Sequence, residues 1–347
     1  MGAGIMCLPR SAEGLPLVNA PARIAALVLA LASATALAGP AVLLSPVLGR
    51  PESVTLHGRV LAETPHGSTA LSRNLRRLAA RNWKGARVEV SFLGVEALVT
   101  SGEDGEFQVT LQPPKGRTFP VGGHEARALV TGASASARVE ILADTTPFLV
   151  VSDFDDTLAI SEVTQPDKLV TNALLRDADT QKVVPGMAGF YGCLGTDAGA
   201  VPAFALVSGS PVQFGPRVGT FLARHGFPAG FGLYLRDLGP GTLSDYKQPI
   251  IRGLLQRIPY PVVLVGDSGE KDPEVYAQIR DEFPGRVRAI YIRDAGNSGD
   301  AARFKDMVLF KDASSAAEHA VQGGLARRAC VSTAFPPVAP QAGAGVP

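Results

Sequence analysis

Residues 52–144 consist of short runs in which apolar and polar residues alternate, separated by Gly, Pro, Asp or Ser. Alternation with a period of two is typical of half-buried β-strands. Within one of these runs, the pair Asp104-Gly105 predicts a hairpin between two strands. We therefore expect a small β-sandwich over residues 50–145, whose role is packing or recognition. Its predicted strands lie at 53–63, 87–94, 96–112, 125–132 and 136–144.

After Phe148 the pattern changes to strands that alternate with helices. This order predicts an α/β domain over residues 146–322, with a mostly parallel sheet covered by helices on both faces. From residue 323 to 347 the chain is rich in Ala, Pro and Gly, which predicts a disordered tail. The predicted strands lie at 148–153, 203–208, 231–237, 261–267 and 286–294, and the helices at 187–197, 211–226, 246–258 and 273–283.

The N-terminal segment 1–49 predicts a leader or an anchor. From Ile24 to Gly49 there is no charged side chain, and the sequence Ala36-Leu37-Ala38 forms an A-x-A cleavage pattern. The apolar run then continues to Gly49, long enough for an uncleaved segment to span a bilayer. A cleaved signal peptide and a membrane anchor both remain open, and either places the rest of the chain outside the cytoplasm.

The composition of the chain limits the classes of function that it can have. The chain has 347 residues and a formal charge of +1, which gives no whole-chain attraction to nucleic acid. Its three cysteines are Cys7, Cys193 and Cys330, without a CxxC pair, so neither a structural zinc site nor a disulfide framework is expected. For Cys193 a small buried hydrophobic side chain is favoured over a bridge to Cys330.

Polar residues gather where predicted strands end or helices begin, and parallel strands present these ends at one edge of a sheet. The stretch "SDFDDT" crowds carboxylates at the end of a buried strand, which is costly unless a cation lies among them. The other clusters are "LVSGSP", "DYKQ" and "LVGDSGEKDPEVY". Their candidate residues are Asp153, Asp155, Thr157, Ser208, Lys247, Asp267 and Asp272.

These residue types suit phosphate ester hydrolysis. Mg²⁺ prefers oxygen ligands such as one or two carboxylates, which Asp153 and Asp267 can supply. Asp153 can attack phosphorus to form an aspartyl-phosphate, and Asp155 can donate and then accept the proton. Ser208 and Lys247 are expected to hold the phosphoryl oxygens. Asp156 needs no role beyond that of a solvated or loop-bonding acid.

Helix ends add local support. Lys247 is expected to open its helix, where a cation is unfavourable unless a phosphate lies between it and the helix dipole. Ser210-Pro211 is expected to cap the helix at 211–226. Asp272 precedes Pro273 and Glu274, a pattern that is also typical of a helix cap.

The four motifs resemble those of the haloacid dehalogenase superfamily of aspartyl-phosphate phosphatases. The stretch from about Pro147 to Asp294 is similar to the Mg²⁺-dependent phosphatidate phosphatase domain named after a yeast actin-patch protein. The β-rich region before it is similar to what bacterial members carry. The chain departs from the family pattern at Val212, where an aromatic residue is common, and at Gly209, where Asn is common.

The resemblance implies a Rossmann-like haloacid dehalogenase fold and assigns the site. Asp153 is the implied nucleophile and Asp155 the implied acid/base. The implied phosphate-binding residues are Thr157, Ser208, Gly209 and Lys247, and the implied Mg²⁺ ligands are Asp153, Asp155, Asp267 and Asp272.

Residues 72–87 form a basic stretch with six Lys or Arg, no acid and Trp83. It suits either a solvated helical face or loop, or a contact with an anionic membrane surface. The sequence thus predicts Mg²⁺-dependent phosphomonoester hydrolysis through a phospho-aspartate, with phosphatidate or another anionic lipid as the favoured substrate. The alternatives are an exported phosphatase for soluble phosphomonoesters and a binding module without turnover.

Overall fold

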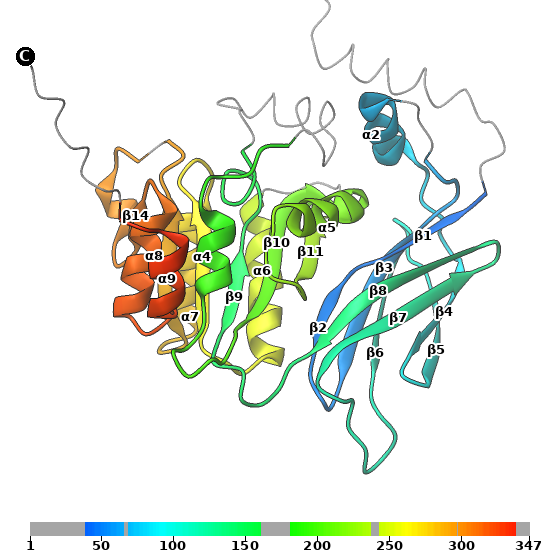
Figure 1. Ribbon diagram of the computed structural model, residues 1–347. Coiled ribbons are helices and arrows are strands. Elements are labelled where there is room, and N and C mark those ends of the chain that lie inside the picture. The colour runs from blue at the N-terminus through cyan, green and yellow to red at the C-terminus, as the bar shows by residue number, and fades with distance from the viewer. Residues whose placement is uncertain (1–38, 66–68, 161–180, 237–242, 297, 338–347) are drawn as a thin grey trace, which may run out of the picture. The chain divides into compact units, whose positions relative to one another are not determined.

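The structure is a computed structural model that describes residues 39–65, 69–160, 181–236, 243–296 and 298–337 (Figure 1). The predicted cleavage site and the expected leader up to residue 38 lie outside the described residues. None of the described helices is long and apolar enough to cross a membrane.

A six-stranded parallel sheet forms the centre of the α/β domain (Figure 1). Its order is β11-β10-β9-β12-β13-β14, so the sequence direction reverses between β9 and β12. Such a reversal opens a crevice at the carboxyl ends of the two strands, where ligands bind in open α/β sheets. The strands are β9 (Leu149–Ser152), β10 (Ala203–Pro211), β11 (Gly232–Arg236), β12 (Val262–Asp267), β13 (Val287–Arg293) and β14 (Val308–Phe310).

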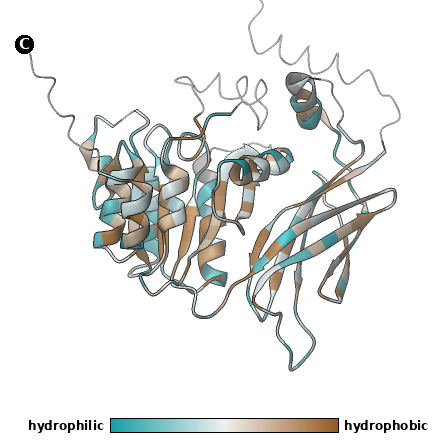
Figure 2. Ribbon diagram, in the orientation of Figure 1, coloured by the Kyte–Doolittle hydropathy of each residue, from teal (hydrophilic) through white to brown (hydrophobic). Residues whose placement is uncertain are grey.

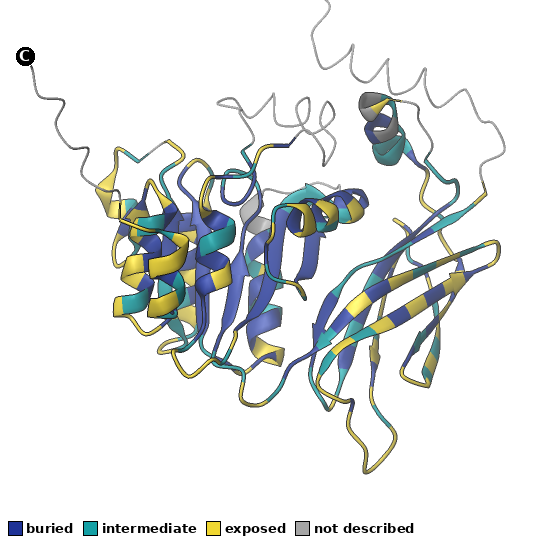
Figure 3. Cartoon of the chain, viewed as in Figure 1, coloured by how far each residue is buried: buried dark blue, intermediate teal, exposed yellow. Residues whose placement is uncertain are grey.

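Helices cover both faces of this sheet, which explains why its strands are continuously apolar (Figures 2 and 3). Val150 packs into one hydrophobic cluster, whereas its neighbours Leu149 and Val151 pack into the cluster on the other face. The first face is covered by α4 (Met187–Cys193), α5 (Gly215–Arg224), α8 (Ala313–Gln322) and α9 (Arg328–Ala334), and the second by α6 (Leu243–Arg257) and α7 (Asp272–Glu282).

The N-terminal region contains two further sheets that share one hydrophobic cluster. A single helix, α2 (Ala70–Ala79), is described in this region. The three-stranded sheet consists of β1 (Ala41–Leu44), β3 (Val54–Leu61) and β6 (Glu106–Leu111). The five-stranded sheet consists of β2 (Val47–Gly49), β8 (Ala133–Ile141), β7 (Gly122–Val130), β4 (Arg87–Phe92) and β5 (Val95–Thr100).

The expected hairpin at Asp104-Gly105 is wrong, because β5 and β6 belong to different sheets. β5 pairs with β4, and the Leu93-Gly94 turn between them has positive φ at both residues (48° and 80°). Such turns match the right-handed twist of paired strands. The turn at Gly105 instead delivers β6 to β3, since Val60 N donates to Gly105 O at 2.8 Å.

The boundary expected at residue 49 also changes. Residues 41–49 form β1 and β2, which pair with β3 and β8. Val42 and Val47 are buried in the cluster of the β region. The last part of the apolar run is therefore explained by packing within this region.

The basic stretch 72–87 does not form one exposed cationic face among its described side chains. Arg76 and Arg77 on α2 are half-buried, and Trp83 packs against the cluster of the β region. Arg81 and Lys84 are exposed but pair with Glu63 and Glu103. This arrangement favours the simpler interpretation, a partly solvated helix followed by a loop.

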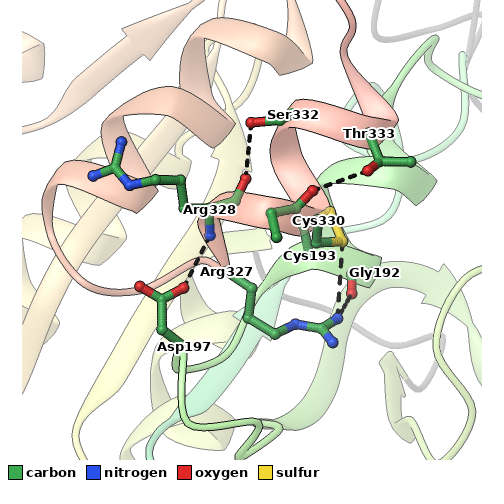
Figure 4. The surroundings of a disulfide bond; sticks show 9 residues. Gly192, Cys193, Asp197, Arg327, Arg328, Cys330, Ser332 and Thr333 are labelled. Carbon is green, nitrogen blue, oxygen red and sulfur yellow. Dashed lines mark hydrogen bonds between the residues drawn. A yellow bond between two sulfur atoms is a disulfide. The ribbon is translucent and has the colours of Figure 1, made fainter.

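The C-terminal segment is ordered further than expected. Residues 328–334 form α9, which packs on α4 and α8. A disulfide joins Cys193 of α4 to Cys330 of α9, so the expectation of an unpaired Cys193 is wrong (Figure 4). Arg328 N also donates to Asp197 at 3.0 Å. The remainder of the expected tail, residues 338–347, lies outside the described residues.

Removing the bridge tests its contribution to stability. The bridge closes a loop of 137 residues, and a disulfide that closes a long loop contributes about 2–5 kcal/mol. The variant with Cys193→Ser and Cys330→Ser should lose that amount in the free energy of unfolding, measured with urea. Reductant should lower the stability of the wild type towards that of the variant and leave the variant unchanged. An equal response of both proteins to reductant would contradict the bridge.

Candidate active site

Asp153 and Asp155, the two aspartates of the DxD pattern, lie in a tight loop after β9. Asp153 N donates to Val265 O of β12 at 2.9 Å, so its backbone continues the ladder between neighbouring strands. Asp156 reverses the chain with a φ of 53°, in the left-handed region, and its amide donates to Ala159 O at 2.7 Å. The loop therefore begins at the carboxyl end of β9, at the sheet reversal between β9 and β12.

Lys247 of α6 brings a buried ammonium group to this loop. Its Nζ lies 2.8 Å from Asp153 Oδ1, 2.5 Å from Asp272 Oδ1 and 3.5 Å from Glu270 Oε2. Lys247 is the fifth residue of the described helix, so the expectation that it opens the helix is wrong. Carboxylates provide its counter-charges in this structure.

Three aspartates form a cluster that can hold a divalent cation. One carboxylate oxygen each of Asp153, Asp267 and Asp272 lies within 4.8 Å of the others, and all three side chains are buried. Gly269 N donates to Asp267 Oδ2 at 2.6 Å, while the buried Oδ1 has no hydrogen-bond partner among the described residues. A buried carboxylate oxygen requires a partner, and a hard cation such as Mg²⁺ fits this set of oxygens.

The electrostatics of the site favour the binding of a cation. Burial raises the pKa of Asp153 well above its ordinary value, and the carboxylates of Asp272, Glu270 and Asp267 add to this rise while Lys247 opposes it. Burial, together with Asp272, also raises the pKa of Asp267 to about 8. Although burial alone would lower it, the nearby carboxylates raise the pKa of Lys247, which stays charged. One ammonium group does not balance this many acids.

Asp272 is a member of the cluster and not a helix cap. It is the first residue of α7, and its carboxylate contacts Lys247 and accepts from Asp267 N at 3.2 Å. A Cβ atom at Gly266 would lie 2.4 Å from Asp272 Oδ2. The close approach of this carboxylate to β12 therefore requires the glycine that precedes Asp267.

Asp155 is held apart from the three clustered aspartates. Its Oδ2 accepts from Ser210 Oγ at 2.8 Å, and its carboxylate is not part of the cluster. We therefore leave this carboxylate out of the candidate metal ligands. Burial raises the pKa of Asp155 even though the Ser210 hydrogen bond lowers it, so the carboxyl group keeps its proton to higher pH than an ordinary aspartate.

The expected phosphate-binding residues from β10 and the loop after β9 lie at the same edge of the sheet. Ser208 is buried near the end of β10, and its Oγ accepts from Ser210 N at 3.0 Å. Gly209 follows it on the strand, and Thr157 donates to Asp153 Oδ2 at 3.3 Å. Ser210-Pro211 still belongs to β10, so it does not cap a helix as expected.

The contacts that three further residues make in the site were not predicted from the sequence. Ser210 was assigned to a helix cap, although it holds Asp155. Glu270 contacts Lys247, and Arg293 at the end of β13 donates to Asp156 O at 2.7 Å. Glu270 lies inside the "GDSGEKD" motif and Arg293 lies at the end of a predicted strand. The sequence therefore places both residues near the site, but it does not determine where their side chains point.

Hydrogen bonds between buried side chains support the backbone of Asp153. Tyr191 of α4 donates to Ser152 Oγ at 2.7 Å, and Ser152 Oγ donates to Asp153 O at 2.6 Å. Tyr191 and Ser152 are fully buried. This chain of hydrogen bonds connects helix α4, and through its disulfide α9, to the backbone of Asp153.

With this geometry described, comparison with known proteins becomes informative. Residues 148–294 match the family model of the phosphatidate phosphatase APP1 catalytic domain. That stretch contains the four aspartates of the site, Asp153, Asp155, Asp267 and Asp272, together with Lys247, Glu270 and Arg293. The match to the APP1 catalytic domain ends at Asp294, so β14, α8 and α9 lie outside it.

Two curated proteins are similar over the same region. Phosphatidate phosphatase APP1 of Saccharomyces cerevisiae is 31% identical over 157 residues, which is 43% of this chain and 26% of that protein. An uncharacterized protein of Schizosaccharomyces pombe is 32% identical over 157 residues, covering 42% of this chain and 25% of that protein. The similarity thus spans about a quarter of the length of these relatives.

Solved structures resemble the chain only weakly. A chain of the Pnkp1/Rnl/Hen1 complex covers 49% of this chain and 47% of its own length, with 16% identity and a TM-score of 0.30. A score this low supports no conclusion about the site.

Titration calorimetry with MgCl₂ tests the metal site without using turnover. We expect Mg²⁺ to bind the wild type, and Asp267→Asn to weaken binding at least tenfold. Because the pKa of Asp267 is raised to about 8, bound protons must leave when the metal binds, so affinity should fall as the pH drops from about 8 to 6.

Glu282→Gln is a matched control, since Glu282 is on the surface and pairs with Arg252. This variant should bind Mg²⁺ as the wild type does. Equal binding by wild type and Asp267→Asn would contradict the metal site.

Proposed function

We propose that this chain is a Mg²⁺-dependent phosphatase that hydrolyses phosphomonoesters through a phospho-aspartate on Asp153. The observation that carries the proposal is the meeting of Asp153, Lys247 and the unpartnered oxygen of Asp267 at the sheet reversal. The match to the APP1 catalytic domain supports it independently.

In the first step, a carboxylate oxygen of Asp153 attacks phosphorus and the bond to the leaving oxygen breaks. Asp155 donates its proton to that leaving oxygen, which its raised pKa favours. Ser210 holds the donor in place. Bound to Asp153, Asp267 and Asp272, Mg²⁺ would neutralise carboxylate and phosphoryl charge.

In the second step, Asp155 accepts a proton from the water that attacks the phospho-aspartate, so inorganic phosphate leaves and both aspartates return to their first state. The ammonium of Lys247 stabilises the charge on the phosphoryl oxygens, and Ser208 contributes its hydroxyl. In this scheme Lys247 exchanges part of its contact with the carboxylates for the phosphoryl group.

We also propose a specific fold for each of the two regions. The strand order and the position of the DxD loop support a haloacid dehalogenase fold for residues 146–322. The shared cluster of the two N-terminal sheets supports a small β-sandwich.

Phosphatidate is the substrate we favour, because the family description and the yeast relative both carry that activity in their names. Since the similarity spans a quarter of that relative, the lipid substrate and contact with a membrane surface are part of the proposal. Soluble phosphomonoesters are the alternative that the experiment below separates.

We propose an exported or membrane-anchored protein. The disulfide between Cys193 and Cys330 supports this location, because such bridges persist in oxidising compartments. The apolar segment before residue 39 supports it as well.

Asp153→Asn tests the nucleophile. Phosphate release from phosphatidate in detergent micelles and from a soluble aryl phosphate should fall at least a thousandfold for both esters, because the substitution removes the attacking oxyanion. Asp155→Asn should retain the first step with a good leaving group and accumulate phosphorylated protein, detectable by mass spectrometry. Preference of the wild type for the lipid or the soluble ester decides the substrate class.

Asp156→Asn is the matched control, because it removes a neighbouring carboxylate and Asn tolerates the left-handed conformation of that position. It should keep most of the wild-type activity. Substantial phosphate release by Asp153→Asn would rule out this mechanism.

Arg293→Met tests the support of the loop. Loss of the hydrogen bond to Asp156 O should loosen the position of Asp155 and lower kcat about tenfold to a hundredfold. The KM should change little, because Arg293 does not contact the phosphate-binding side chains in the described contacts. Arg293→Lys should recover part of kcat, and a rise in KM at constant kcat would argue against a positioning role.

A further inference from the structure

Glu270 is an acidic residue of the site that the proposed mechanism does not use. It lies in the loop between β12 and α7, and its Oε2 is 3.5 Å from Lys247 Nζ. About a quarter of its side chain (24%) is exposed, whereas Asp153 and Asp272 are buried. Among the described acids that contact Lys247, Glu270 is thus the most exposed to solvent.

The position of Glu270 is built into the structure. Arg303 donates to Glu270 O at 2.8 Å and to Ser268 O at 3.0 Å, and also pairs with Glu274 of α7. These contacts fix both the loop and the start of the helix. The backbone that carries Glu270 is therefore held in place, and its carboxylate lies 3.5 Å from Lys247 Nζ.

The charges of the site make Glu270 a surplus anion. Asp153, Asp267 and Asp272 carry three negative charges when ionised. Lys247 and one divalent cation carry three positive charges, which balance them. Glu270 adds one more negative charge, next to the place where the phosphoryl group must bind.

Glu270 also lies close to the phosphorus that Asp153 would attack. Its Oε2 is 3.5 Å from Lys247 Nζ, which is 2.8 Å from Asp153 Oδ1. Because Asp153, Lys247 and Asp272 are buried, a bulky leaving group must extend towards the more exposed side of the site, where Glu270 lies. A second anion on the leaving group would meet this carboxylate at short range.

We propose that Glu270 is a specificity-determining residue that selects phosphomonoesters whose leaving group carries no negative charge near the phosphate. The inference rests on the proposed phosphatase function. An uncharged diacylglycerol satisfies the requirement, whereas a leaving group with its own phosphodiester or carboxylate does not. The physical basis is repulsion between like charges in a partly water-excluded site, where screening is weaker than in bulk water.

The test compares two substrate pairs that differ by one charge. The lipid pair is phosphatidate and phosphatidylglycerol phosphate in mixed micelles, and the soluble pair is 3-carbamoylphenyl and 3-carboxyphenyl phosphate. Each is assayed with the wild type, Glu270→Gln and the control Glu282→Gln. The wild type should favour the neutral leaving group, and Glu270→Gln should raise the relative kcat/KM for the charged member about tenfold, unlike Glu282→Gln.

A binding measurement separates recognition from turnover. The affinities of the two aryl phosphates are measured by calorimetry for Asp153→Asn and for the double variant Asp153→Asn with Glu270→Gln. The double variant should bind the charged ester relatively more tightly by a similar factor.

Each outcome decides the proposal. An equal loss of activity for both members of a pair in Glu270→Gln would show that Glu270 only holds Lys247, and would overturn the inference. An unchanged preference would overturn it as well. If the wild type hydrolysed none of the four esters, the proposed function itself would fail, and this inference with it.

Discussion

The contact between Lys247 and the buried carboxylates is the interaction on which the site depends. Its ammonium lies 2.8 Å from Asp153 and 2.5 Å from Asp272, inside a region from which water is largely excluded. Removing one partner from such a cluster leaves a buried charge without compensation. The short β9–β12 ladder, the glycine at 266 and the first turn of α7 all serve to bring these groups together.

Much of this arrangement follows from the local sequence. The α/β order could be predicted because strands buried on both faces are continuously apolar, as in β9 and β12. The aspartates could be predicted because parallel strands present their carboxyl ends at one edge. Asp155 was expected among the metal ligands, but its side chain turns to Ser210, a direction that spacing along the chain does not determine.

The remaining features depend on contacts between distant segments. Helix α9 has few large apolar residues and gains its place through packing on α4. The Cys193–Cys330 pairing needs two helices separated by most of the domain to meet. The turn at Gly105 has the composition of a hairpin, yet the pairing of β6 with β3 decides its path. Arg293 lies at the end of β13, which does not pair with β9, yet it donates to the loop that follows β9.

The bridge between α4 and α9 turns residues 193–330 into a covalent ring. Ser208, Lys247 and the acids from Asp267 to Asp272 lie within this ring, whereas Asp153 and Asp155 precede it. A single proteolytic cut in a surface loop of the ring leaves both halves attached to each other and to β9. In an environment rich in proteases, the parts that bind phosphate and metal would therefore stay joined to the attacking aspartate after such a cut.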